Sequence, residues 1–172
     1  MSGFDSFGAV ARLCPSCGLC CNGVLFGDVQ LQGSDDPEFL AAHGLCTKKK
    51  GRKLIFQQPC SCFDGRWCKI YATRPSRCRA FECGLLQRVQ ANELSPTVAL
   101  RRIREAQRRV KIIHDLLCAL GNADRSLPLM ERYKQVVAQP IELSEARPLA
   151  QRSRLMRLMN SFMQMVHREF LA

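Results

Sequence analysis

Residues 95–121 read SPTVALRRIREAQRRVKIIHDLLCALG and carry the clearest helical pattern in the chain. Ser95 can cap such a helix, and Pro96 suits its first turn, where the missing amide of proline would have no partner. Gly121 favours a stop, so the predicted helix is about 36 Å long. Apolar side chains recur along it in steps of three and four residues, which indicates one buried face: Ala99, Ile103, Ala106, Val110, Ile113, Leu117 and Leu120.

Helical patterns continue toward the C-terminus. A second segment begins near residue 127 and ends at about residue 138, before Pro140. A third runs from about residue 144 to residue 170, and we expect it to pack antiparallel against the helix of residues 95–121. Residues 85–172 are therefore predicted to form a basic helical region, a hairpin or bundle. The apolar positions of the third segment are Leu155, Met159, Phe162, Val166 and Phe170.

The chain before residue 85 has a different composition. Ten of the eleven cysteines lie there, among many glycines and prolines, and only Cys118 lies beyond. The lack of long periodic runs predicts loops, short helices and a small strand near residues 53–56. Because so little apolar core is available, ligation of a metal would supply the order. We predict a cysteine-cluster metal-binding module at residues 1–84 joined to the helical region, in a mainly α protein.

The cysteine content and the charge depend on where the protein works. No run of about 18 or more apolar residues is present, and the N-terminal residues lack the pattern of a secretory signal, so we expect a cytoplasmic protein without membrane contact. Disulfides are rare in a reducing compartment, and dense thiols there indicate metal or cluster ligation. The formal net charge is +11, but ligand cysteines bind as thiolates and offset part of it. Some of the arginine excess then balances the site.

The spacing of the cysteines indicates thiolate centres. Residues 14–21 read CPSCGLCC, and a second group follows in residues 60–83. Zinc takes four ligands, commonly in closely spaced pairs, while iron–sulfur clusters use similar spacing in runs of three with a fourth cysteine from elsewhere. The spacing leaves both open. Adjacent Cys20 and Cys21 must point differently, so we expect them to serve two metal ions or to bridge them.

Residues 60–83, CSCFDGRWCKIYATRPSRCRAFEC, complete a recognisable pattern. Together with the CxxCxxCC run they resemble the YkgJ-type cysteine-cluster family of zinc- or iron-chelating domains, over about residues 12–84. Cys62 lies where the family more often has an apolar residue, and Cys46 lies in a variable connection, so neither is an expected ligand. The resemblance implies eight ligands: Cys14, Cys17, Cys20, Cys21, Cys60, Cys68, Cys78 and Cys83.

Four further side chains are predicted to support these ligands. Arg74 and Arg79 keep their charge and can donate hydrogen bonds to sulfur, and Arg79 is the preferred candidate. The alternative is that these arginines are solvated or pair with surface carboxylates. Tyr71, together with Phe81, is expected to pack over the site as apolar cover.

We therefore predict a protein that coordinates zinc or an iron–sulfur cluster through its cysteine cluster, with an open cellular role. Some longer members of the family resemble flagellin lysine methylases, so an iron–sulfur-dependent enzyme such as a protein lysine N-methyltransferase is one alternative. The residues after 84 lie outside the family's motif, so the resemblance does not carry that activity over. A second alternative is a zinc-stabilised module that binds a protein partner through the C-terminal helices, or nucleic acid through the arginines of residues 96–119.

The remaining candidate residues are assigned structural roles. His43, His114 and His167 are scattered and show no ligand spacing to a cysteine. The basic run of residues 48–53 is expected to be a solvated loop. Cys118 lies one residue off the apolar stripe and is expected to be a buried small side chain.

Overall fold

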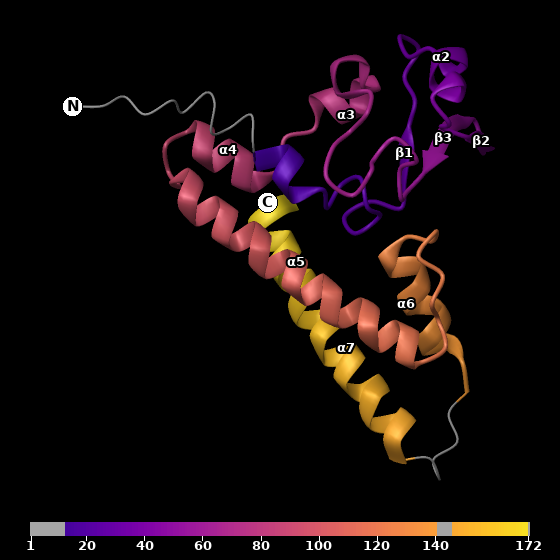
Figure 1. Cartoon of the computed structure of the whole chain (residues 1–172), viewed down its shortest axis with the longest axis vertical. Helices are drawn as coiled ribbons and strands as arrows, with labels where there is room; N and C mark the ends of the chain where they lie inside the picture. Colours follow the sequence, from indigo (N-terminus) through magenta and orange to yellow (C-terminus); the bar gives the residue numbers. More distant parts are fainter. Residues whose placement is uncertain (1–12, 141–145, 172) are drawn as a thin grey trace.

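A computed structural model of the chain describes residues 13–140 and 146–171 (Figure 1). It confirms a mainly α protein with a small cysteine-rich part. Residues 13–17 are helical. The other elements, in chain order, are β1 (Asp28–Gln30), α2 (Pro37–Ala42), β2 (Thr47–Lys50), β3 (Lys53–Gln57), the 3-10 turn η1 (Tyr71–Thr73), α3 (Ser76–Ala80), α4 (Gly84–Gln90), α5 (Pro96–Ala119), α6 (Leu129–Ala138), α7 (Ala146–Val166) and the π-helical turn η2 (His167–Leu171).

Helix α5 begins and ends where the sequence predicts. The Ser95 hydroxyl accepts a hydrogen bond from the amide of Val98 at 3.4 Å, and a proline follows the cap. At the other end Gly121 has a φ of +86°, which glycine adopts without strain. The stripe is buried, since Ala99 and Ile113 are both 0% exposed. Local caps and apolar spacing therefore determine this helix.

Helix α7 packs antiparallel against α5, and α6 lies beside the C-terminal half of α5 (Figure 1). The predicted second helix is thus confirmed as α6. The predicted start of the third helix near residue 144 lies outside the described residues, and its last turn is the π-helical η2. None of the described helices is long and apolar enough to cross a membrane.

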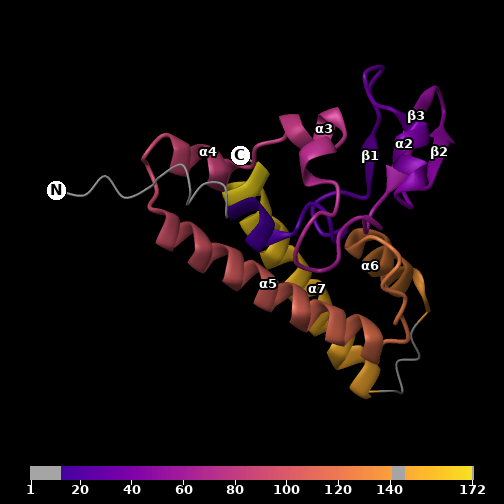
Figure 2. The ribbon, with the colours of Figure 1, turned by 45° about the horizontal axis from the view of Figure 1, so that its top comes forward.

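The strands form one antiparallel sheet in the order β1-β3-β2, set apart from α5 and α7 (Figure 2). The predicted strand near residues 53–56 is confirmed as β3. The loop expected for the basic run is wrong, because Lys48 to Lys50 lie in β2 and a turn at Gly51, with φ +60°, leads into β3. Lysines suit an exposed edge strand, where their charge discourages pairing with another chain.

Two apolar clusters hold these elements. The larger one joins Leu13, Leu19 and Val24 to the faces of α4, α5, α6, α7 and η2. The smaller one lies under the sheet and comprises Leu31, Leu40, Leu45, Phe56, Cys62 and Ile70. The division of the chain at residue 84 stays a prediction.

Candidate metal centre

The first four cysteines lie in a short helix and the turns that follow it. Residues 13–17 are helical and residues 19–23 form turns. Between them Gly18 has a φ of +66°, and a Cβ there would approach Phe63 Cζ to 2.5 Å. Only glycine suits this close approach. Helix α5 holds the segment, because Gln107 Nε2 donates to the carbonyl of Ser16 at 2.9 Å and of Cys17 at 3.0 Å.

The other four family cysteines come from three places. Cys60 and Cys68 flank a turn after β3, Cys78 lies in α3, and Cys83 stands at the N-cap of α4. The backbone joins the two halves of the motif, since the Cys60 amide donates to the Cys21 carbonyl at 2.8 Å. Cysteines about 40 to 60 positions apart are therefore neighbours in space.

Three cysteines of the first run have Cys83 as a neighbour. Burial raises the pKa of the Cys17 thiol to about 12, and repulsion from Cys83 and Cys14 adds to it. Burial also raises the pKa of Cys20, and Cys17, Cys14, Cys21 and Cys83 contribute in that order. Cys14 is exposed as a residue, yet desolvation of its sulfur still raises its pKa, again with a contribution from Cys83. Cys14, Cys17, Cys20 and Cys83 are called the first thiol group below.

Cys21 belongs to a different neighbourhood from Cys20. Burial raises the pKa of Cys21 to about 12, and the thiols that add to it most are Cys60, Cys68 and Cys78. Burial likewise raises the pKa of Cys78 to about 12 and that of Cys60 to about 11, and Cys68 contributes to both. These four residues, Cys21, Cys60, Cys68 and Cys78, are called the second thiol group.

The two groups lie close to each other. Cys14 of the first group interacts with Cys68 and Cys21 of the second, and Cys21 precedes Cys83 among the charges that raise the pKa of Cys20. For Cys17, Cys21 and Cys78, however, the charges that raise the pKa most are those of thiols in the same group.

An apolar wall surrounds the first thiol group. A cavity of about 50 Å³ is lined by its four cysteines and Cys21, and by hydrophobic side chains that include Leu19, Ile103 and Phe170. Phe81 also lines it, as expected for cover, and packs edge-on against Phe26 with ring centres 5.0 Å apart. Apolar surroundings limit water access and tune a metal bound to sulfur.

Backbone amides face two of the sulfurs. Against the larger effect of burial, the amide of Leu19 lowers the pKa of Cys17, and the amide of Cys62 lowers that of Cys60. In both cases the donor is two residues after the cysteine. Hydrogen bonds to sulfur favour the thiolate, the form that binds metal. The sequence does not single out these two amides, although the close spacing of cysteines in short turns is the signal that points to amide donors.

Arg74, of the predicted supporting residues, lies beside thiols of both groups. Its charge lowers the pKa of Cys14 and of Cys78 against the larger effect of burial. Its guanidinium stacks 3.8 Å from the ring centre of Tyr71, which is 40% exposed. Arg79 interacts instead with Asp35, which anchors the start of α3 by accepting from the Ser76 amide at 2.7 Å.

The three other cysteines have different surroundings. Cys62 is 1% exposed and its thiol donates to the carbonyl of His43 at 3.3 Å, so it retains its proton and packs in the smaller core. Cys46 is exposed just before β2. Cys118, which is expected to be buried, is only half-buried, and its sulfur accepts a hydrogen bond from Arg132 Nη2 at 3.9 Å.

The donor set fits a metal ion or cluster. All eleven cysteines are free thiols. Within residues 13–140 and 146–171, no three Cys, His, Asp or Glu side chains already converge as a ready-made ligand group. Buried thiols that repel one another cannot ionise together without a cation between them. Metal binding would therefore draw the sulfurs of a group closer and release their protons.

One family model matches residues 13–109, over half of the chain, and is described as CxxCxxCC, a putative zinc- or iron-chelating domain. No curated protein and no solved structure matches the chain.

Proposed function

The chain belongs to the CxxCxxCC family of zinc- or iron-chelating domains, and we propose that its eight family cysteines form two separate four-thiolate metal centres. The first thiol group would hold one centre and the second thiol group the other. Metal binding in general follows from the family, and the assignment of four particular cysteines to each of two centres is the new element.

One observation carries this proposal: the adjacent residues Cys20 and Cys21 have different thiol neighbours. Among neighbouring charges, those of Cys17 and Cys14 raise the pKa of Cys20 most, whereas those of Cys60 and Cys68 raise the pKa of Cys21 most. Four thiolates complete the tetrahedron of a structural zinc site and equally hold an iron–sulfur cluster. Eight thiolates in two sets of four therefore supply two complete centres of either kind.

The residues around the groups would favour the bound form. A bound metal would supply the positive charge that lets four buried thiolates coexist. Amides at Leu19 and Cys62 donate toward sulfur, and Arg74 adds positive charge between the groups. A centre with four protein thiolates has no open position for a substrate, which is typical of structural or electron-transfer sites. This favours a metal-binding module, while the lysine methyltransferase and nucleic-acid alternatives stay predictions.

The test is metal and sulfide analysis of protein purified without oxygen, with matched cysteine variants. Cys17→Ser and Cys78→Ser each remove a ligand from one group, and Cys46→Ser removes an exposed cysteine outside both. We expect each of the first two variants to lose one centre and keep the other, and Cys46→Ser to keep both. A brown protein with iron and acid-labile sulfide identifies clusters, and a colourless one with zinc identifies zinc sites.

Three results would contradict the proposal. If Cys17→Ser and Cys78→Ser both lose all bound metal while remaining folded, the eight cysteines form one centre. If the double variant Cys17→Ser/Cys78→Ser keeps a full complement of metal, the ligands lie elsewhere. If the purified protein is folded without metal and its thiols pair as disulfides, the metal-binding function itself is wrong.

A further inference from the structure

A second candidate site lies between α5 and the segment formed by the end of α7 and η2. A pocket of about 600 Å³ is formed there between α5 and the end of α7 with η2. This volume falls within the range of about 300–1,000 Å³ that small-molecule sites occupy. Its cationic lining comes from Arg101, Arg102, Arg104, Arg108, Arg109 and Arg168.

The pocket has a large excess of positive charge. Six guanidiniums line it against two carboxylates, those of Glu105 and Glu169, which leaves four positive charges unmatched. Glu105 pairs with Arg108 and with Arg109, the latter at 2.7 Å. Arg101 and Arg104 are exposed and make no ion pair among the described residues. Such clustered charge attracts anions and raises their local concentration.

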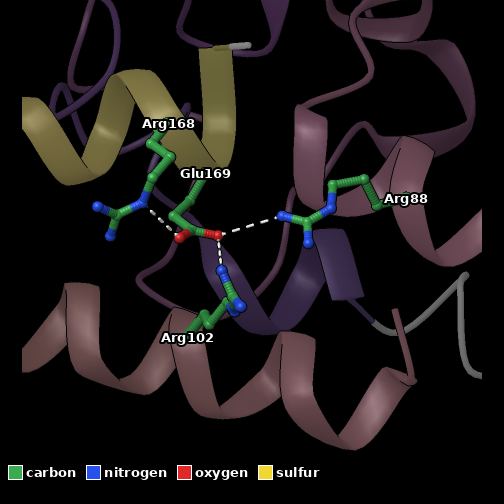
Figure 3. A network of polar contacts seen from close by, with 4 residues as sticks. All are labelled: Arg88, Arg102, Arg168 and Glu169. Carbon is green, nitrogen blue, oxygen red and sulfur yellow. Dashed lines mark hydrogen bonds and ion pairs between the residues drawn. The ribbon is translucent and has the colours of Figure 1, made fainter. Parts of the chain in front are cut away.

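Glu169 is the buried carboxylate that holds several arginines in place at the pocket. Its side chain is 6% exposed and is shared by Arg102, by Arg168 at 3.0 Å and by Arg88 of α4 at 3.5 Å (Figure 3). Although burial opposes ionisation, hydrogen bonds from Arg168 and Arg102 hold the pKa of this carboxyl below its usual range. One carboxylate therefore fixes guanidiniums from three elements without neutralising them.

The positions of the arginines favour a compact anion. Arg101, Arg104 and Arg108 are spaced by three and four residues and share one face of α5. Arg168 lines the pocket from η2, so the guanidiniums surround the pocket from two elements instead of lying in one row along α5. Guanidinium forks bind phosphate oxygens in pairs of hydrogen bonds. None of the described lining residues is aromatic, so the pocket offers no platform for base stacking.

We propose that this pocket binds a small molecule with two neighbouring phosphate groups, as in a pyrophosphate or a bisphosphate. Each phosphate carries a charge of about −1.5 to −2 at neutral pH, so two of them match the excess of four positive charges. This function goes beyond the proposed metal centres, with which the pocket shares no lining residue.

The test is calorimetry of inorganic pyrophosphate binding to the metal-loaded full chain at about 0.15 M salt. The pocket variant is Arg101→Gln/Arg104→Gln, and the matched control is Arg154→Gln/Arg157→Gln, which removes two exposed arginines of α7 outside the pocket. All four positions are exposed, so circular dichroism should show unchanged helix in both. We expect the pocket variant to weaken binding by about tenfold or more, and the control variant to leave it unchanged.

Each other outcome overturns the proposal. Absence of pyrophosphate binding to the unmodified protein at millimolar concentration removes the site. Equal weakening in both variants shows a general effect of net charge. Binding heat that persists unchanged in the pocket variant places the phosphate elsewhere, for example on the metal. Tighter binding of a single-stranded oligonucleotide than of pyrophosphate, lost in the pocket variant, assigns the face to nucleic acid instead.

Discussion

The helical region around α5 and α7 and the sheet region around β1, β2, β3 and α3 are held together differently. Among the described residues, the larger core contains twenty buried side chains and the core under the sheet six. Cys17 and Cys83 of the first thiol group pack against the larger core. Cys60, Cys68 and Cys78 of the second group pack against the smaller one. Apolar burial thus accounts for the helices, whereas we predict that the sheet region depends on ligation of metal by its sulfurs.

Removal of metal should separate the two regions most clearly. Binding of a structural zinc ion is worth about 10–16 kcal/mol in small domains and is itself folding free energy. After chelation under reducing conditions, we expect the amides of β1, β3 and α3 to lose protection from hydrogen exchange. The amides of α5 and α7 should stay protected. Mass spectrometry of exchanged peptides measures both at once.

The same experiment contains its control. Returning metal should restore protection in the sheet region, which excludes irreversible oxidation as the cause. If α5 and α7 lose protection together with β3, the two regions form one cooperative unit and the contrast between them is wrong.

Truncation of a side chain in the larger core should destabilise the helical region and leave metal binding unchanged. Phe162 of α7 is 0% exposed, and Phe162→Ala is expected to cost about 3–5 kcal/mol of the free energy of unfolding. Met156→Ala, on the same helix at 45% exposure, should cost less than about 0.5 kcal/mol. Denaturant titration followed by circular dichroism measures both. The metal content of folded Phe162→Ala should equal that of the unmodified protein, and a loss of metal would show that helix packing also maintains the ligands.

The predictability of each region follows from the range of its interactions. The caps and apolar stripe of α5 lie within the helix itself, so its bounds were predicted almost to the residue. Lys48 to Lys50 form a strand because they pair with β3. A run of charged residues gives no sign of this pairing in the sequence. The different neighbours of Cys20 and Cys21 depend on contacts with residues 60–83, and sequence spacing does not specify them.

The supporting residues show the same limit. Arg79 is adjacent to Cys78 and lies nearer the last cysteines in sequence than Arg74, yet it is Arg74 whose charge lowers the pKa of Cys14 and of Cys78. Arg79 of α3 instead interacts with Asp35, which lies in a loop distant in sequence. The arginines of residues 96–119 are evident from the sequence as a basic group. Their meeting with Arg168 and Glu169 required the antiparallel packing of α7 to be known in atomic detail.

Acid should weaken the helical region through His114 of α5. The pKa of this imidazole is lowered from 6.5 to about 4, mainly by burial and then by the charges of Arg132 and Arg125, against an opposing effect of Asp115. Arg132 is 0% exposed and its Nη1 lies 2.6 Å from His114 Nδ1, so the guanidinium donates to an unprotonated ring nitrogen. The folded protein therefore keeps His114 neutral.

The sign of the pH dependence follows from that neutral state. The unfolded chain binds a proton at His114 below pH 6.5, whereas the folded protein does so only below about pH 4. The stabilisation is complete above pH 6.5 and is lost as the pH falls toward 4. Between pH 7.5 and pH 5 the loss is at most about 2 kcal/mol, and partial solvation of the ring reduces it.

A His114→Gln variant isolates this contribution, because glutamine can accept a hydrogen bond but does not titrate. At pH 7.5 we expect the variant to be less stable than the unmodified protein, and at pH 5 the difference between them should shrink by up to about 2 kcal/mol. Acid also protonates cysteine ligands, but that effect is common to both proteins and cancels in the difference, provided that their metal contents are equal. A difference that stays constant between pH 7.5 and pH 5 would mean that His114 becomes charged in the folded protein as readily as in the unfolded chain, and that buried Arg132 does not govern it.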